Sequence, residues 1–185
     1  MDRNFRFHKD KTALLVVDVQ EKLIGLEDRS AEVLGAIQKS IKGFQILGLP
    51  IVVTEQYPVG LGQTVSGIKS LLGPNQTYLA KTAFSCLGDF QINSSLLAMP
   101  VSQWVLVGIE AHVCILQSAK DLIAAGKQVA VLNDAISSRS IYDFSTAIAE
   151  MRDIGVRISS VETVLFELLQ DSLSPEFKKM SQLLK

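Results

Sequence analysis

Residues 104–114 read WVLVGIEAHVC and contain the two features that decide how the chain is organised. A run of four apolar residues ends at Gly108, which is typical of a strand buried on both faces of a sheet. Cys114 follows six positions later, where a helical pattern has begun. A free cysteine is most often a small apolar group in a core. Whether Cys114 is such a group or a nucleophile depends on what the chain places at comparable positions.

Strand and helix patterns alternate on both sides of this stretch. Apolar, β-rich runs predict further strands at 13–18, 51–55, 77–81, 128–134 and 156–160. Helical spacing is found at 31–48, 89–98, 112–126 and 142–155, and again in the C-terminal tail. A turn region with Pro58 and three glycines, residues 56–67, is followed by a further short helical stretch. Alternating strands and helices predict a parallel sheet covered on both faces. We therefore expect a three-layer α/β/α fold with about six strands.

The bulk composition bounds the class of protein. The chain has 185 residues, of which 48% are hydrophobic and 20% charged, as in a globular protein. It shows no internal repeat and no linker, so we expect one domain over residues 1–185. The net charge is −1, which gives no basic excess to hold a phosphate backbone, and nucleic acid is not expected as the main partner. No apolar run approaches the roughly 20 residues of a membrane helix, so no membrane partner is expected.

The opening segment and the cysteines bear on the compartment. Residues 1–10, MDRNFRFHKD, are charged and lack the apolar region of a signal peptide. The two cysteines, Cys86 and Cys114, form no disulfide framework. A reducing, cytoplasmic location fits both observations, and import into an organelle stays open. A mean hydropathy of +0.27 is high for a soluble chain and favours a homo-oligomer.

Three reactive side chains fall at the carboxyl ends of predicted strands, where open α/β sheets bind ligands. Asp18 ends the first strand, Lys81 ends the third, and Cys114 lies just beyond the fourth. The unsatisfied N–H groups at a helix start and a nearby lysine would both favour the thiolate of Cys114. A carboxylate could accept the thiol proton, and the helix-start amides could hold an oxyanion.

Each of these residues also has a structural interpretation. An aspartate after an apolar strand often caps a turn, a lysine at a strand end is often solvated, and a cysteine often packs in a core. The joint placement of Asp18, Lys81 and Cys114 at one edge favours the catalytic interpretation without excluding the other.

Several segments together resemble the isochorismatase-like cysteine hydrolases, and in particular the isochorismatase domain-containing proteins and the YcaC-like hydrolases. The segments are LLVVDVQ (14–20), TEQYPVGLGQTV (54–65), LAKTAFS (79–85), VLVGIEAHVCILQSAKDL (105–122), DAISSRS (134–140) and AIAEMRDIGVRISSVE (147–162). The resemblance implies a six-stranded parallel sheet in the order 3-2-1-4-5-6. The first and fourth strands would then be neighbours, which brings Asp18 close to Cys114.

The resemblance also implies roles for individual residues. Asp18 would take the thiol proton, Lys81 would stabilise the thiolate, and Cys114 would attack an acyl carbon to form a thioester. A cis peptide between Ile109 and Glu110 would aim the Glu110 amide into an oxyanion hole beside that of Cys114. Many relatives have threonine at the Glu110 position, so no role that requires a threonine hydroxyl carries over.

Two departures from other branches of this superfamily narrow the function. Nicotinamidases bind a metal through an aspartate and histidines after the second strand, where this chain has Glu55, Gln56 and Tyr57. The only histidines are His8 and His112, so no metal and no cofactor are expected. Isochorismatases proper do not use a nucleophilic cysteine, whereas this chain retains one.

The sequence thus predicts a metal-free cysteine hydrolase of a small amide or related acyl compound. Possible contributors to the substrate pocket are Gln20, Gln56, Tyr57, Phe84 and His112. Gln56, Tyr57 and Phe84 are chosen because they follow the second and third strands, and they could equally be loop anchors or interface residues. Two alternatives are open: a non-catalytic scaffold or regulatory protein of the same fold that binds partners, and a hydrolase of another bond such as an ester. The identity of the small-molecule substrate does not follow from the sequence.

Overall fold

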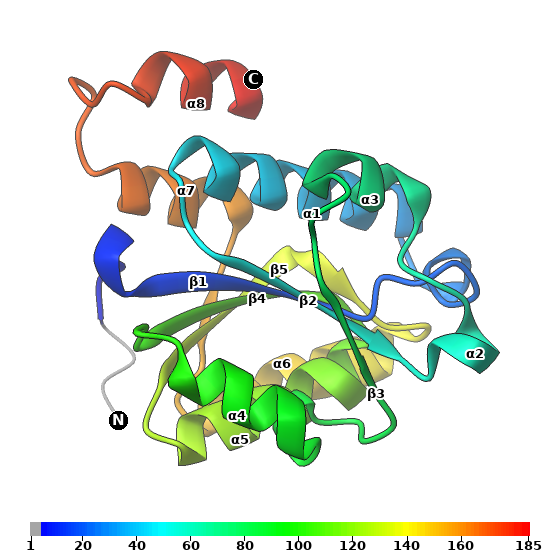
Figure 1. Cartoon of the computed structure of the whole chain (residues 1–185). Helices are drawn as coiled ribbons and strands as arrows, with labels where there is room; N and C mark the ends of the chain where they lie inside the picture. The colour runs from blue at the N-terminus through cyan, green and yellow to red at the C-terminus, as the bar shows by residue number, and fades with distance from the viewer. Residues whose placement is uncertain (1–4) are drawn as a thin grey trace.

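The computed structural model describes residues 5–185 and contains one sheet of six parallel strands in the order β3-β2-β1-β4-β5-β6 (Figure 1). The strands are β1 Thr12–Val17, β2 Ile51–Gln56, β3 Tyr78–Lys81, β4 Gln103–Ile109, β5 Gln128–Ser137 and β6 Arg157–Ser159. Helices cover both faces. The predicted three-layer fold and its strand order are confirmed.

The helices fall where the sequence predicts them, with two additions. They are α1 Ser30–Ile46, α2 Pro58–Leu61, α3 Ser66–Leu72, α4 Phe90–Ala98, α5 Leu116–Ala124, α6 Ile141–Asp153, α7 Val161–Leu169 and α8 Phe177–Leu184. The short α2 forms within a segment expected to be a turn. A π-helical turn, Ala111–Ile115, precedes α5 and contains Cys114. In residues 5–185 no helix combines the length and apolarity that crossing a bilayer requires.

The central strand β1 separates two apolar cores. Its six residues are all buried, and alternate side chains point to opposite faces. Leu14 and Val16 pack in the core under α1, α7 and α8. Leu15 and Val17 pack in the core shared with α4, α5 and α6. Figure 1 shows these two groups of helices on opposite sides of the sheet. A run of apolar residues without alternation is therefore what this strand requires.

Gly108 lies where β1 and β4 meet at the centre of the sheet. It pairs with Val17 and has φ +122°, a conformation that side chains other than hydrogen rarely adopt. A Cβ atom built on Gly108 would lie 2.1 Å from the carbonyl oxygen of Val17. The glycine after WVLV therefore lets β4 approach β1 closely, just before both strands reach the edge that carries Asp18 and Glu110.

Candidate functional site

Asp18 is the first residue after β1, and its backbone turns there with φ +53°. The side chain is 1% exposed, and its two carboxylate oxygens have different partners. Oδ1 accepts a hydrogen bond from the hydroxyl of Thr54 at 2.7 Å. Oδ2 accepts one from the ammonium of Lys81, also at 2.7 Å. The carboxylate is therefore held in a fixed orientation by two neighbouring strands.

Lys81 is the last residue of β3 and is 2% exposed. Besides Asp18, its Nζ donates to Gln56 Oε1 at 2.7 Å and to the carbonyl oxygen of Phe84 at 3.0 Å. The carbonyl oxygen of Ala83 lies farther away, at 3.3 Å, so the three hydrogens of the ammonium group are surrounded by oxygen acceptors. The Nζ also lies 3.6 Å from the sulfur of Cys114. One buried cation thus touches both the carboxylate and the thiol.

Cys114 reaches this cluster from the π-helical turn after β4 and is 6% exposed. Three residues separated by up to 96 positions in the chain therefore meet at the point where the strand order reverses, between β1 and β4. This is the edge at which open α/β sheets bind ligands. The arrangement supplies a nucleophile, a proton acceptor and a cation within hydrogen-bonding reach of one another.

The electrostatics of Cys114 differ from the sequence-based expectation. Burial raises the pKa of the Cys114 thiol, and the negative charge of Asp18 raises it further, while Lys81 offsets only part of this. The expectation that a helix start and a lysine would lower this pKa was wrong in direction, because it took no account of burial or of the nearby carboxylate. Burial and the nearby carboxylate thus favour the thiol form of Cys114 over the thiolate.

Lys81 stays charged in this environment. Burial alone would lower the pKa of its ammonium, which lies near Cys114 and Cys86, but the negative charge of Asp18 and the hydrogen bond to it outweigh burial and raise the pKa. The second of these cysteines, Cys86, is fully buried, and burial raises the pKa of its thiol to about 11. Its sulfur lies 3.8 Å from the hydroxyl of Thr54. Cys86 is thus a packed thiol that contacts Thr54, the residue whose hydroxyl is hydrogen-bonded to the Asp18 carboxylate.

The peptide bond between Ile109 and Glu110 is cis, at the position that the resemblance implies. The Glu110 side chain points away from the triad and accepts a hydrogen bond from Arg139 Nε at 2.7 Å. Its carbonyl oxygen accepts hydrogen bonds from the N–H groups of Val113 and Ile115, each at 3.2 Å. Glu110 therefore connects β4 to the turn that carries Cys114.

The residues expected in a substrate pocket divide into three kinds. Gln20 and Gln56 are buried and bind each other: Gln20 Nε2 donates to the Gln56 carbonyl at 2.9 Å, and Gln56 N–H donates to Gln20 Oε1 at 2.7 Å. Tyr57 and Phe84 are 53% and 55% exposed beside the cluster. His112 Nδ1 lies 2.9 Å from Ser138 Oγ, so this ring is directed to the segment after β5.

Thr54 was not singled out from the sequence. It lies in β2 opposite Val17 of β1, and its hydroxyl donates to Asp18. The only signal for it is a polar residue inside the apolar run IVVTE (51–55).

No group of three or more His, Cys, Asp and Glu side chains in residues 5–185 is arranged to hold a metal ion. Glu55, which lies where nicotinamidases have a ligand, has its carboxylate occupied by Thr64. Its Oε1 accepts from the Thr64 amide at 2.7 Å and from the Thr64 hydroxyl at 2.8 Å. The side chains at this position therefore do not form a set of ligands that would bind such a metal.

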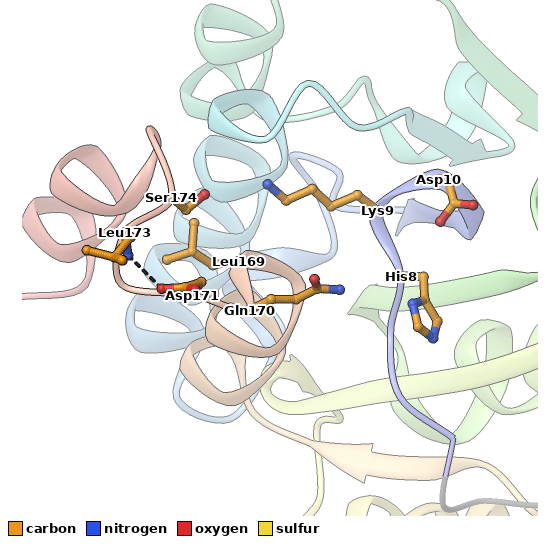
Figure 2. Close-up of a pocket in the computed structure, with 8 residues that line it drawn as sticks. All are labelled: His8, Lys9, Asp10, Leu169, Gln170, Asp171, Leu173 and Ser174. Carbon is orange, nitrogen blue, oxygen red and sulfur yellow. Dashed lines mark hydrogen bonds between the residues drawn. The ribbon is translucent and has the colours of Figure 1, made fainter.

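A surface hollow of about 550 Å³ lies at the opposite end of β1 from Asp18 (Figure 2). It is formed by the segment before β1, which includes His8 and Lys9, and by the loop after α7. Figure 2 shows Lys9 extended toward Ser174 and Gln170 extended toward His8. Lys9 Nζ lies 3.5 Å from Glu176 Oε2, and neither Cys86 nor Cys114 lines the hollow. Size alone therefore does not mark the reactive part of this molecule.

Comparison with known families and proteins gives a consistent result. The family model of the isochorismatase domain matches residues 12–163. Isochorismatase domain-containing protein 1 of Danio rerio is 37% identical over 169 residues, which are 91% of this chain and 59% of that protein. The chain therefore spans about three-fifths of this relative.

Two solved structures share the fold. One is described as the MAR1 ribonuclease of Caenorhabditis elegans; it has a TM-score of 0.91 and 37% identity, over 97% of this chain and 92% of that one. The other, YcaC of Escherichia coli, is described as an octameric hydrolase of unknown specificity. It has a TM-score of 0.90 at 21% identity, over 96% of this chain and 90% of that one, and at this identity it bears on the fold alone.

Proposed function

Because the chain belongs to the isochorismatase domain family, a family of hydrolases, we propose that it is a cysteine hydrolase of a small amide or related acyl compound. The family assignment confirms the resemblance inferred from the sequence. The observation that carries the proposal is the position of Lys81 Nζ, 2.7 Å from Asp18 Oδ2 and 3.6 Å from Cys114 Sγ. A buried carboxylate and a buried thiol that share one cation are expensive to assemble, and sites of this kind are typically functional.

Acylation begins with proton transfer from the Cys114 sulfur to the Asp18 carboxylate. The thiolate then attacks the acyl carbon, a C–S bond forms, and the carbonyl oxygen becomes an oxyanion. Asp18 returns the proton to the departing nitrogen, so the C–N bond breaks and an amine and a thioester remain. Because the pKa of the Cys114 thiol is raised, the thiolate forms only with this transfer to Asp18.

Deacylation reverses the roles of the same groups. Asp18 takes a proton from water, the hydroxide attacks the thioester, and the acid leaves as the sulfur recovers its proton. Lys81 stays charged throughout and stabilises whichever of Asp18 and Cys114 is the anion. The backbone amides of Glu110 and Cys114 are assigned to the oxyanion, as the family resemblance implies.

The proposed enzyme is a homo-oligomer that acts without a metal or other cofactor and resides in the cytoplasm. Large apolar side chains are exposed around the carboxyl edge of the sheet, where a second copy would cover them. They include Tyr57, Val59, Phe84, Ile141 and Tyr142.

The test compares the wild type with Cys114→Ala on a panel of small amides and esters. The expected result is a fall in kcat/KM of at least about a thousandfold, because the nucleophile is lost. Cys86→Ala is the matched control and should keep most of the activity. A covalent acyl adduct on Cys114, seen by mass spectrometry of the wild type, would support the thioester directly.

Three results would contradict the proposal. Equal rates for the wild type and Cys114→Ala would reject the nucleophile. Cleavage of RNA that survives Cys114→Ala, with no turnover of amides or esters, would favour the activity named for the C. elegans relative. Absence of any turnover, together with a partner that binds equally well to Cys114→Ala, would favour the scaffold alternative.

A further inference from the structure

Glu27 is a buried acid for which the proposed triad chemistry has no use. It lies in the loop between β1 and α1 and is 6% exposed. Neither of its carboxylate oxygens has a hydrogen-bond partner in the described part of the chain. Buried carboxylates are normally paired, since an unpaired one costs several kcal/mol. The chain therefore carries a defect that folding alone does not explain.

The backbone holds this carboxylate in place. The Glu27 N–H donates to the carbonyl of Ile24 at 3.2 Å, and the N–H of Asp28 donates to the carbonyl of Ser138 at 3.2 Å. The Ser137 hydroxyl donates to the carbonyl of Asp28 at 2.7 Å. The loop is thus fastened to the carboxyl end of β5, which fixes the backbone position from which the Glu27 side chain extends.

The charges that face Glu27 are Glu110 and Arg139. Burial, and next the negative charge of Glu110, raise the pKa of Glu27, and Arg139 offsets part of this, so that the pKa is about 7. Arg139 is the cation of this group, but its hydrogen bond goes to Glu110, and 60% of its side chain is exposed. Arg139 thus forms a hydrogen bond with only one of the two carboxyl groups, and the carboxyl group of Glu27 is left without a hydrogen-bond partner in the described part of the chain.

Glu27 and the proposed acyl site are connected through Glu110. The amide of Glu110 is the proposed oxyanion donor. The negative charge of its side chain is the one that raises the pKa of Glu27. Glu27 follows β1 and Glu110 follows β4. These two strands are paired at the centre of the sheet, and both residues lie at the same edge of it as Cys114. A positive group that approached this edge together with an acyl carbon would supply the missing charge.

We propose that Glu27 is a recognition site for an ammonium or guanidinium group carried by the substrate. This inference rests on the proposed function, and it narrows the substrate class to acyl compounds with a basic group. The ligand cation replaces Arg139 beside Glu27, and the Arg139 side chain turns outward into the water that already surrounds most of it. Glu27 is then a specificity-determining residue and takes no part in bond breaking.

The test uses two isosteric thiol reagents, so it needs no knowledge of the substrate. Both 2-aminoethyl and propyl methanethiosulfonate transfer their thioalkyl group to a cysteine sulfur and release methanesulfinate, but only the first is cationic. Modification of Cys114 is followed by peptide mass spectrometry, and each rate is divided by that of a free thiol. The quantity of interest is the ratio of the cationic to the neutral rate.

In the wild type the cationic reagent should react faster at Cys114 than the neutral one. Glu27→Gln should lower the ratio about fivefold or more, because one nearby negative charge is lost. Asp28→Asn, a change on the next and half-exposed residue, should alter it by less than about twofold. Arg139→Ala should raise it. An unchanged ratio in Glu27→Gln, or an equal effect of Asp28→Asn, would overturn the inference.

A second measurement separates this inference from the proposed function. If Cys114 resists both reagents, the accessible nucleophile is in doubt, and binding of n-butylammonium decides the role of Glu27 alone. The expected result is a rise in Tm with n-butylammonium chloride, relative to sodium chloride, in the wild type and not in Glu27→Gln. No rise in the wild type would overturn the inference.

Discussion

At the amino ends of the central strands, the buried amide of Gln103 is fully satisfied. Its Oε1 accepts from the His8 N–H at 2.8 Å and from the Thr12 hydroxyl at 3.0 Å. Its Nε2 donates to the carbonyl of Arg6 at 2.8 Å and to Gln128 Oε1 at 2.9 Å. These groups are neutral, and the side-chain amide uses both its donors and its acceptor.

At the carboxyl ends of the same strands, the buried groups are charged and incompletely matched. Lys81 and Asp18 form a fully buried ion pair, Cys114 has a raised pKa beside them, and Glu27 has no hydrogen-bond partner among residues 5–185. Saturated neutral groups stabilise a fold, whereas unmatched charges destabilise it and remain available for a ligand or a proton. The hydrogen bonds of Gln103 at the amino edge therefore stabilise the fold, and the charged groups at the carboxyl edge are the ones available for the proposed chemistry.

The largest effect is expected from Lys81→Met, which leaves Asp18 buried without its cation. We expect a loss of about 3–5 kcal/mol in the free energy of unfolding, measured by urea denaturation, together with loss of activity. Lys120→Met removes the cation of a half-exposed pair with Glu150 and should cost less than about 1 kcal/mol. Similar losses for the two variants would show that the buried pair has no special status.

The next effect concerns Glu27 and pH. The carboxyl of Glu27 has a raised pKa of about 7, so the folded protein holds its proton more tightly than the unfolded chain does. Its contribution to stability is therefore present below about pH 4.5 and is lost as the pH rises through 7. Between pH 5 and pH 8 the wild type should lose up to about 3 kcal/mol through this group.

The measurement is urea denaturation of the wild type and Glu27→Gln at both pH values. The variant should lack this part of the loss, so its stability relative to the wild type should increase with pH. A difference between the two proteins that does not change with pH would show that Glu27 titrates normally.

A smaller effect separates reactivity from turnover at Cys114. After burial, the charge of Asp18 is the main cause of the raised pKa of the thiol. Asp18→Asn should lower that pKa, so iodoacetamide should alkylate Cys114 about tenfold faster at pH 8 while hydrolysis is lost. Asp28→Asn should leave the alkylation rate unchanged. Slower alkylation in Asp18→Asn would show that the carboxylate activates the sulfur in the resting protein.

The smallest effect is expected at the amino edge. Thr12→Val removes the hydroxyl that donates to His8 and Gln103, at a cost of about 1 kcal/mol in the free energy of unfolding. Activity and its pH dependence should be unchanged, as measured with whatever amide or ester the wild type hydrolyses. A large loss of activity in this variant would contradict the division of roles between the two edges.

The sequence by itself determined the layers and the placement of the reactive residues. Apolar runs without alternation specify strands buried on both faces, and helical spacing between them specifies a parallel sheet. Asp18, Lys81 and Cys114 follow three of these strands, so any sheet of this topology places them at one edge. Such patterns are local in the chain and can be recognised before any contact is known.

Only the tertiary structure decided how these residues affect one another. The sequence does not show the raised pKa of Cys114 or the carboxylate of Glu27 without a hydrogen-bond partner in the described part of the chain. Nor does it show the hydrogen bond from Thr54 to Asp18 or those between Gln20 and Gln56. Each depends on burial and on neighbours from strands or loops that are distant in the chain. Desolvation and Coulomb interactions vary steeply with distance and surroundings, so their balance, and even its sign, is set by three-dimensional packing.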